Sequence, residues 1–314
     1  MKTKLDMKPR SLRLWLCCTF ALGAGLALLA APQAAPKKFD SAQQAADALI
    51  AASQNYDVAA LTEILGADSM DLLTSQDPVQ DRKIGMEFGA KAKVKNSLVV
   101  DPDNPKFVVL TVGDDDWPLP IPILKTGKTW SFDTKIGREE IRARRIGNNE
   151  LDALQICRGY VEAQYEYARE KHEGSRVNQY AQRIISTPLT QDGLAWQNPD
   201  GTWGGPIGKG IAEAIQQGYS NRTQPYHGYF YKILKGQGPN APLGQMDFVV
   251  KGAMIGGFAL VAAPAQYKVT GVMTFLVGSD GIVYQKDNGA NSLDIFTKME
   301  RYNPDKTWTI VEEE

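Results

Sequence analysis

Apolar residues recur at helical spacing in the first third of the chain, and each such segment opens with a helix-start signal. Ser41 and Gln44 form a capping box. Asp57 is placed to cap a second helix that Gly66 stops, and Asp77 precedes a proline at the first helical position of a third. The predicted helices span residues 41–55, 57–66 and 77–94.

The hydrophobic period changes to two after residue 95, which indicates strands. Turn-forming sequences rich in Asn, Asp, Gly and Pro separate the apolar stretches. The predicted strands are "NSLVVD", "KFVVLTV", "PLPIPIL" and "KTWSFD". Helices followed by a curved antiparallel sheet predict an α+β domain over residues 36–136.

The stretch "GDDDWPLPIP", residues 113–122, suggests either a metal site or a turn. Neighbouring residues of a strand point to opposite sides, and the spacing of a calcium-binding EF-hand is missing, so we predict a solvated turn. The alternating prolines remove hydrogen-bond donors from one strand edge. We therefore expect Leu119, Ile121 and Ile123 to face the core, with Trp117 and Trp130 at the core or its rim.

A strongly helical segment begins after Gly137, and a series of predicted strands follows it. Gly147 and Asn148 predict a break in this helix, with Asn148 capping its second part. Cys157 lies on the apolar stripe, where a small buried hydrophobe is the expected role. The later strands are predicted at residues 225–234, 246–250, 257–264, 271–277 and 281–286, and the last helix at 291–302. This predicts a second α+β domain over residues 137–314.

The amino terminus has the order of a secretory signal, with five basic residues before an uncharged apolar run at 14–31 and a small-residue region after it. We predict a signal peptide over 1–35 and a periplasmic or extracellular protein; an uncleaved membrane anchor is the alternative. Removing residues 1–35 leaves 30 basic and 35 acidic residues, a net charge near −5. That charge disfavours nucleic-acid binding, and we expect no membrane contact beyond the export signal.

The chain contains few of the residues and motifs that common catalytic sites use. The predicted mature chain keeps a single cysteine, Cys157, which excludes a disulfide framework within it and a thiolate zinc cluster. There are two histidines, and no Gly-x-Ser-x-Gly segment that would present a serine nucleophile. The Gly-rich "GTWGGPIGKG" lacks the Gly-Lys-Ser/Thr ending of a phosphate loop. We assign no catalytic residue, no metal and no cofactor.

His227 is the best single candidate for chemistry because Tyr226 and Tyr229 flank it at the start of a predicted strand. It can act as a general base or ligand-binding group, or it can hydrogen-bond the backbone and fix the strand entrance. Both interpretations stay open at this point. Gly228 beside it predicts a close approach of another part of the chain.

Several segments together resemble one family, the bacterial exported proteins grouped as domain of unknown function 2950. They include "DDWPLPIP", "RRIGNNELDALQICRGYVEAQYEYA", "YAQRIISTP", "PYHGYFYKIL" and "MIGGFALVAAPAQYKVTGVMTF". The resemblance implies no established activity. Members often carry an acidic Asp-x-Asp-Gly turn after the long helix, where this chain has Lys171, His172 and Glu173.

The second half is also similar to the globular part of type IV pilins and pseudopilins, in which a helix lies across an antiparallel sheet. Ala163, Gln164 and Tyr167 match the Ala-Gln-x-x-Tyr motif of that helix. The first domain is similar in outline to the cone-shaped nuclear transport factor two-like fold, which often encloses a pocket. Both are analogies of fold, not of function.

Two functional hypotheses follow. The first is a non-catalytic docking module of the cell envelope that contacts a protein partner through exposed Tyr226, Tyr229, Tyr231 and Trp203. The alternative is a small-molecule binder or hydrolase-type enzyme that uses a pocket in the first domain or the region of His227.

Overall fold

The computed structural model describes residues 35–172, 174–219 and 224–312. Nearly all of the predicted signal peptide lies outside the described residues, and so does Glu173. None of the helices in the described ranges combines the length and the apolar character that a membrane span requires.

The helices predicted for the first third of the chain are confirmed, with their caps. The side chains of Ser41, Asp57 and Asp77 accept hydrogen bonds from the backbone N–H three residues ahead. The helical elements are α1 (Ala42–Gln54), α2 (Val58–Leu65), the 3₁₀ turn η1 (Ala67–Ser69), α3 (Met70–Leu73) and α4 (Pro78–Val94).

An antiparallel sheet follows, in the order β1-β2-β4-β5, with β3 pairing the end of β2. Its strands are β1 (Asn96–Val100), β2 (Phe107–Val112), β3 (Trp117–Pro118), β4 (Ile123–Thr126) and β5 (Thr129–Phe132). A first hydrophobic core forms where α1 packs against α2, α4, β4 and β5. The predicted strand 118–124 divides into β3 and β4, yet Leu119, Ile121 and Ile123 are buried as expected.

The acidic stretch at 113–116 is a turn, as predicted. Gly113 has a φ of 76° and accepts a hydrogen bond from the N–H of Asp116, which has a φ of 49°. The Asp116 carboxylate forms an ion pair with Lys95 at 2.9 Å. The turn therefore joins β2 to β3 and directs its carboxylates to solvent and to a lysine.

The long helix α5 (Arg138–Tyr167) is continuous, so the predicted break at Gly147 and Asn148 is wrong. Glycine in a helix costs about 1 kcal/mol, which the other contacts of a long helix offset. Arg138 and Arg145 in its first turns donate to backbone carbonyls of η1 and α3, and the side chain of Asn149 donates to the carbonyl of Thr270 at 2.8 Å. These contacts hold the helix on both sides of the weak point.

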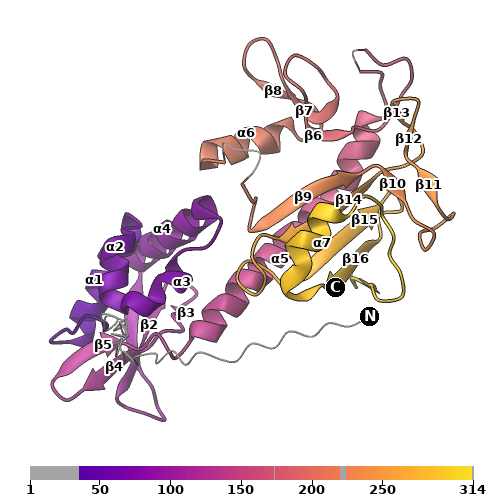
Figure 1. Ribbon diagram of the computed structural model, residues 1–314. Helices are drawn as coiled ribbons and strands as arrows, with labels where there is room; N and C mark the ends of the chain where they lie inside the picture. The colour runs from indigo at the N-terminus through magenta and orange to yellow at the C-terminus, as the bar shows by residue number, and fades with distance from the viewer. Residues whose placement is uncertain (1–34, 173, 220–223, 313–314) are drawn as a thin grey trace, which may run out of the picture. The chain divides into compact units, whose positions relative to one another are not determined.

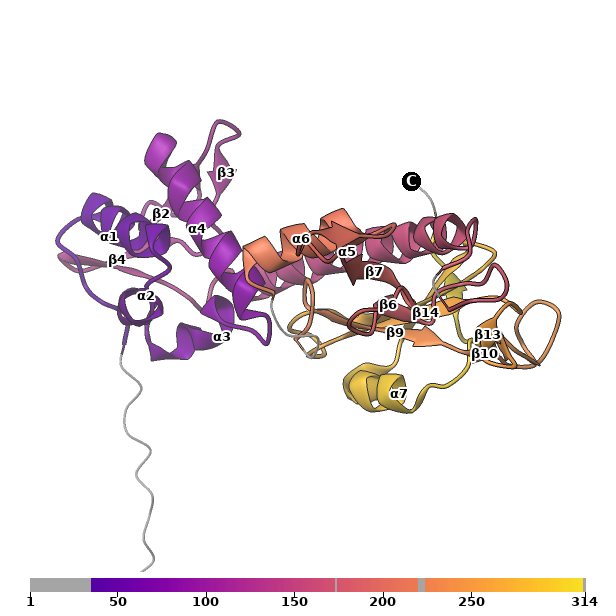
Figure 2. The same cartoon turned by 90° about the horizontal axis from the view of Figure 1, so that it is seen from above.

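The second half forms a five-stranded antiparallel sheet in the order β17-β16-β15-β14-β9. Its strands are β9 (Tyr229–Leu234), β14 (Ala259–Pro264), β15 (Met273–Gly278), β16 (Val283–Asp287) and β17 (Thr309–Ile310). Helix α5 covers one face and α7 (Ser292–Lys298), preceded by the 3₁₀ turn η2 (Gly289–Asn291), covers the other (Figure 1). The turned view of Figure 2 shows the sheet between the same two helices, α5 and α7.

Smaller elements surround this sheet. A three-stranded sheet has the order β6-β7-β8, and two hairpins pair β10 with β11 and β12 with β13. Their bounds are β6 (Arg183–Ile185), β7 (Gly193–Gln197), β8 (Trp203–Gly204), α6 (Gly208–Gln217), β10 (Gly236–Gln237), β11 (Met246–Asp247), β12 (Val249–Val250) and β13 (Ala253–Met254). The second hydrophobic core lies mainly between α5 and the five-stranded sheet. The chain therefore has the predicted α+β class, with two separate hydrophobic cores.

Candidate functional site

A groove of about 1180 Å³ lies among α5, β6, α6 and β9. We call it the α6 groove, because α6 supplies much of one wall. Most of the side chains that line it are apolar. They include Ile156, Ile184, Leu194, Trp203, Ile207, Ile211, Ile215, Tyr226, Phe230, Tyr231 and Ile233.

Four of the five predicted site residues gather at this groove. Tyr226 and Tyr231 line it from the β9 side, and Trp203 lines it from β8. Tyr229 contributes to the same wall, but it is 0% exposed and its hydroxyl donates to the carbonyl of Met273. The expectation that Tyr229 offers surface to a partner is therefore wrong, because its ring belongs to the second core.

His227, the fifth predicted residue, lies next to the groove and pairs with a carboxylate. Its Nδ1 lies 2.5 Å from Oδ2 of Asp152 on α5, and its side chain is 14% exposed. Since a carboxylate accepts, the proton belongs on Nδ1, which leaves an acceptor lone pair on Nε2 when the ring is neutral. Nε2 is buried and has no hydrogen-bond partner in the described parts of the chain.

Aromatic rings enclose this histidine. The ring centroids of Tyr226 and Tyr219 lie 4.3 and 6.2 Å from that of His227. The histidine backbone has a φ of 50°, a left-handed conformation that costs about 1–2 kcal/mol for a residue with a side chain. A general base needs its lone pair within reach of the proton that it accepts, so the enclosed Nε2 is not arranged for proton abstraction in this conformation.

Asp77 holds the backbone beside His227. It is 2% exposed, and its Oδ2 accepts hydrogen bonds from the N–H of Gly228 at 2.9 Å and the hydroxyl of Tyr219 at 3.0 Å. Its Oδ1 caps α4 through the N–H of Gln80. Burial, followed by the Asp77 carboxylate, raises the pKa of Tyr219 well above its ordinary value, so this phenol stays a donor.

The predicted close approach at Gly228 is confirmed. Its φ is 74°, and a Cβ added there would lie 2.4 Å from Nδ2 of Asn149. The start of β9 is thus fixed by Asp77, by Asn149 on α5 and by mutual backbone hydrogen bonds between Tyr226 and Tyr229.

The other titratable candidates are structural. Cys157 is 0% exposed, as predicted, and burial raises the pKa of its thiol to about 12. His172 stacks on Tyr167 with ring centroids 3.7 Å apart, and its Nε2 lies 2.8 Å from the carbonyl oxygen of Tyr167. Within the described ranges, no three His, Cys, Asp or Glu side chains are grouped to hold a metal ion.

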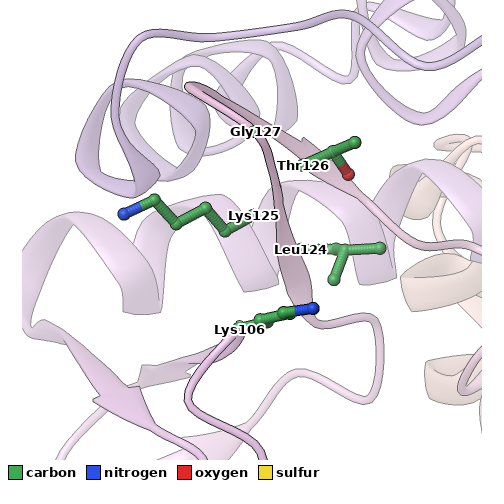
Figure 3. A pocket seen from close by; sticks show the side chains of 5 residues that line it. All are labelled: Lys106, Leu124, Lys125, Thr126 and Gly127. Atoms are coloured by element: carbon green, nitrogen blue, oxygen red, sulfur yellow. The ribbon is translucent and has the colours of Figure 1, made fainter.

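A smaller hollow of about 500 Å³ lies on the β4–β5 hairpin, outside the first hydrophobic core. Figure 3 shows its five lining residues, whose side chains point in different directions rather than toward one centre. One of them, Lys125, places its Nζ 5.3 Å from the ring centroid of Trp130. This hollow does not resemble the enclosed pocket expected from the fold analogy.

Sequence reasoning missed the partners of His227 and Gly228 and the aliphatic wall of the groove. Asp152, which pairs with His227, and Asp77, which accepts from Gly228, are distant from them in the chain, so only the fold brings these residues together. The sequence does contain a signal for this wall. Ile207, Ile211 and Ile215 are spaced by four, which places them on one face of a helix. An apolar face that other elements leave partly open marks a binding groove.

Comparison with known proteins adds one finding. Searches among curated proteins and among solved structures gave no match. A family model described as "Protein of unknown function (DUF2950)" matches residues 36–311, which is most of the chain. The resemblance to the family of domain of unknown function 2950 is confirmed, and the chain belongs to this family.

Proposed function

We propose that this protein is a non-catalytic binding module of the cell envelope that takes up its partner in the α6 groove. The observation that supports the proposal is the volume of the groove, about 1180 Å³, together with its predominantly apolar lining. Apolar surface left in contact with water is unfavourable by about 25 cal/mol per Å², so covering it favours association.

The arrangement of the reactive groups also favours binding over catalysis. The Cys157 thiol is buried, and its raised pKa of about 12 keeps it protonated at neutral pH. The buried Nε2 of His227 is enclosed by tyrosine rings. Neither group presents an activated atom to the groove.

Export rests on the sequence alone, on five basic residues followed by the apolar run at 14–31. Mass spectrometry of the protein purified from its own cell envelope measures this directly. We expect a mass lower than that of the full chain by the predicted signal peptide of residues 1–35. A full-length mass in the membrane fraction would support the anchor instead.

The binding proposal is tested with the neutral fluorophore N-phenyl-1-naphthylamine. Ile215 on α6 lines the groove and is 43% exposed, whereas Ile255 lies outside it and is 50% exposed. We expect the fluorophore to bind the wild type, Ile215→Lys to weaken binding at least about tenfold, and Ile255→Lys to leave it unchanged. Equal binding by wild type and Ile215→Lys would refute the groove as the site.

A second candidate function, an acid–base site, is favoured by the Asp152–His227 pair alone. It requires that Nε2 become accessible in solution. Diethyl pyrocarbonate modifies accessible neutral imidazoles. The rate at which it modifies His227 therefore measures how often Nε2 becomes accessible to solvent. The enclosed geometry predicts modification much slower than that of free imidazole; a rate close to the free one would favour this candidate.

A further inference from the structure

Strand β9 is an outer strand of the five-stranded sheet, and its register shows which backbone groups face outward. β14 is its partner in that sheet, with Tyr229 opposite Pro264. Pro264 has no N–H to donate, and both backbone groups of Tyr229 bond to Tyr226 instead. The N–H and C=O of Tyr229 therefore point away from β14.

Backbone groups of an antiparallel strand alternate in direction. The groups of Tyr231 and Ile233 consequently point outward as well, and both residues line the α6 groove. Lys235 is next in this series, and its carbonyl accepts from the N–H of Phe248. Tyr226 thus closes one end of the outer edge and Phe248 the other, while no described strand pairs with the stretch between them.

The opposite wall of the groove contains a second strand edge. β6 ends its three-stranded sheet, pairs only with β7 among the described strands, and contributes Ile184 and Ile185 to the lining. Two buried polar atoms on the lining residues, Oη of Tyr231 and Oε1 of Gln224, have no hydrogen-bond partner within the described ranges. The groove therefore combines apolar walls with two strand edges and two side-chain oxygens that have no hydrogen-bond partner among the described residues.

Charge distinguishes the end of the groove near the C-terminus of α5. Glu162 and Glu166 line it, stand four residues apart on α5, and make no ion pair with any described residue. Like charges at this spacing near the negative end of a helix dipole are unfavourable. Lys232 and Lys235 also line the groove, from the β9 side, so the negative charge is confined to the α5 wall and is not a net charge of the whole groove. A positive group on the occupant would balance Glu162 and Glu166 at that wall.

We propose that the occupant of the α6 groove is an extended peptide segment of another protein, which adds as a strand to the outer edge of β9. Its alternate side chains are apolar, and a lysine or arginine at one end lies near Glu162 and Glu166. This inference rests on the proposed binding function and specifies its ligand class. Main-chain hydrogen bonds to Tyr231 and Ile233 supply affinity, and the apolar walls select side chains.

The first test uses linear nine-residue peptides displayed on phage and selected on the full chain. We expect selected sequences to alternate apolar residues and to carry a basic residue at one end. N-methylation of a selected peptide, one amide at a time, should weaken binding about tenfold at alternating positions, because each methyl removes one donor. Uniform tolerance of N-methylation would overturn strand addition.

The second test changes the protein edge. Ile233→Pro removes one outward N–H, while the pairing of β9 with β14 uses the neighbouring residues, and proline is tolerated at strand edges. Ile233→Ala removes the side chain and keeps the N–H. We expect a larger loss of peptide affinity for the proline variant than for the alanine variant, with circular dichroism unchanged. Equal affinity of the two variants would contradict a main-chain contact at Ile233.

The outcomes separate this inference from the proposed function. If the fluorophore binds in the groove but no peptide is selected, the groove takes a small apolar molecule and the strand-addition inference is wrong. If neither binds, the proposed function fails too. Glu162→Gln combined with Glu166→Gln should weaken a basic peptide at low salt and leave the neutral fluorophore unaffected.

Discussion

At the scale of single residues, one carboxylate connects the two halves of the described chain. Asp77 caps α4 and also binds the backbone of Gly228 and the hydroxyl of Tyr219. Its sequence context, an aspartate before a proline, predicts the cap alone. The donors of the other two bonds lie more than 140 positions later in the chain, so no local sequence pattern predicts these bonds.

Asp77→Asn should therefore destabilise the protein by about 3 kcal/mol, because the amide cannot accept from all three donors and leaves a buried donor unpaired. Asp57→Asn is the control, since Asp57 caps α2 through one bond to Ala60 and asparagine is an equally good cap. We expect a change below about 0.5 kcal/mol for it. Denaturant unfolding measures both, and equal losses would mean that Asp77 acts only as a cap.

Gly228 permits a second residue-scale prediction. Gly228→Ala combines a φ of 74° with a contact of 2.4 Å to Asn149, whereas Gly201→Ala has a φ of 84° and no atom within 4 Å. The Gly201 variant should lose about 1–2 kcal/mol from backbone strain alone. The Gly228 variant should lose at least about 2 kcal/mol more, because the backbone of β9 must move from α5. Similar melting temperatures of the two variants would contradict the close packing.

At the scale of elements, α5 is joined to α3 by its first turns. Arg138 and Arg142 hydrogen-bond to the Asp71 carboxylate, and Arg145 donates to the carbonyls of Asp71 and Leu72. Burial acts to raise the pKa of Asp71, but the hydrogen bonds and charges of Arg138 and Arg142 outweigh it and hold the pKa below its ordinary value. The ion pairs of Asp71 stabilise the fold only while its carboxyl group is ionised, whereas the bonds of Arg145 to the backbone carbonyls do not depend on that charge.

The sign of the pH dependence follows from that lowered pKa. The stabilisation is present above the pKa of the unfolded aspartate, about 3.9, and is lost as the pH falls through the lower folded value. Asp71→Asn should therefore show a smaller fall in unfolding free energy between pH 7 and about pH 3 than the wild type. Other carboxylates with a lowered pKa, such as Asp192, are common to both proteins.

Glu139→Gln is the control for this experiment. Glu139 also pairs with Arg142, at 3.4 Å, but its side chain is 87% exposed and solvent screens the interaction. Its pH profile should run parallel to that of the wild type. A parallel profile for Asp71→Asn as well would show that the α3–α5 contact does not depend on ionisation.

At the scale of the whole molecule, local signals predicted most elements and few of their contacts. The caps at Ser41, Asp57 and Asp77 and the apolar runs of the buried strands β14 and β15 depend on nearby residues, so they can be recognised in the sequence. The continuity of α5 depends on contacts on both sides of Gly147, which outweigh the local cost of a glycine in a helix. The α6 groove depends on how α5, α6, β6 and β9 are arranged in space. The aromatic residues predicted near His227 make up only part of its lining.

The two hydrophobic cores give a final prediction. Leu110 is 0% exposed in the first core and Leu276 is 1% exposed in the second, so either change to alanine should cost about 2–5 kcal/mol. The connections between the cores include the polar contacts of Asp77 and of the α5 arginines. We therefore expect hydrogen exchange to speed up mainly in β1–β5 for Leu110→Ala and mainly in β14–β16 for Leu276→Ala. Equal acceleration in both sheets by each variant would mean that Asp77 and α5 couple the cores into one cooperative unit.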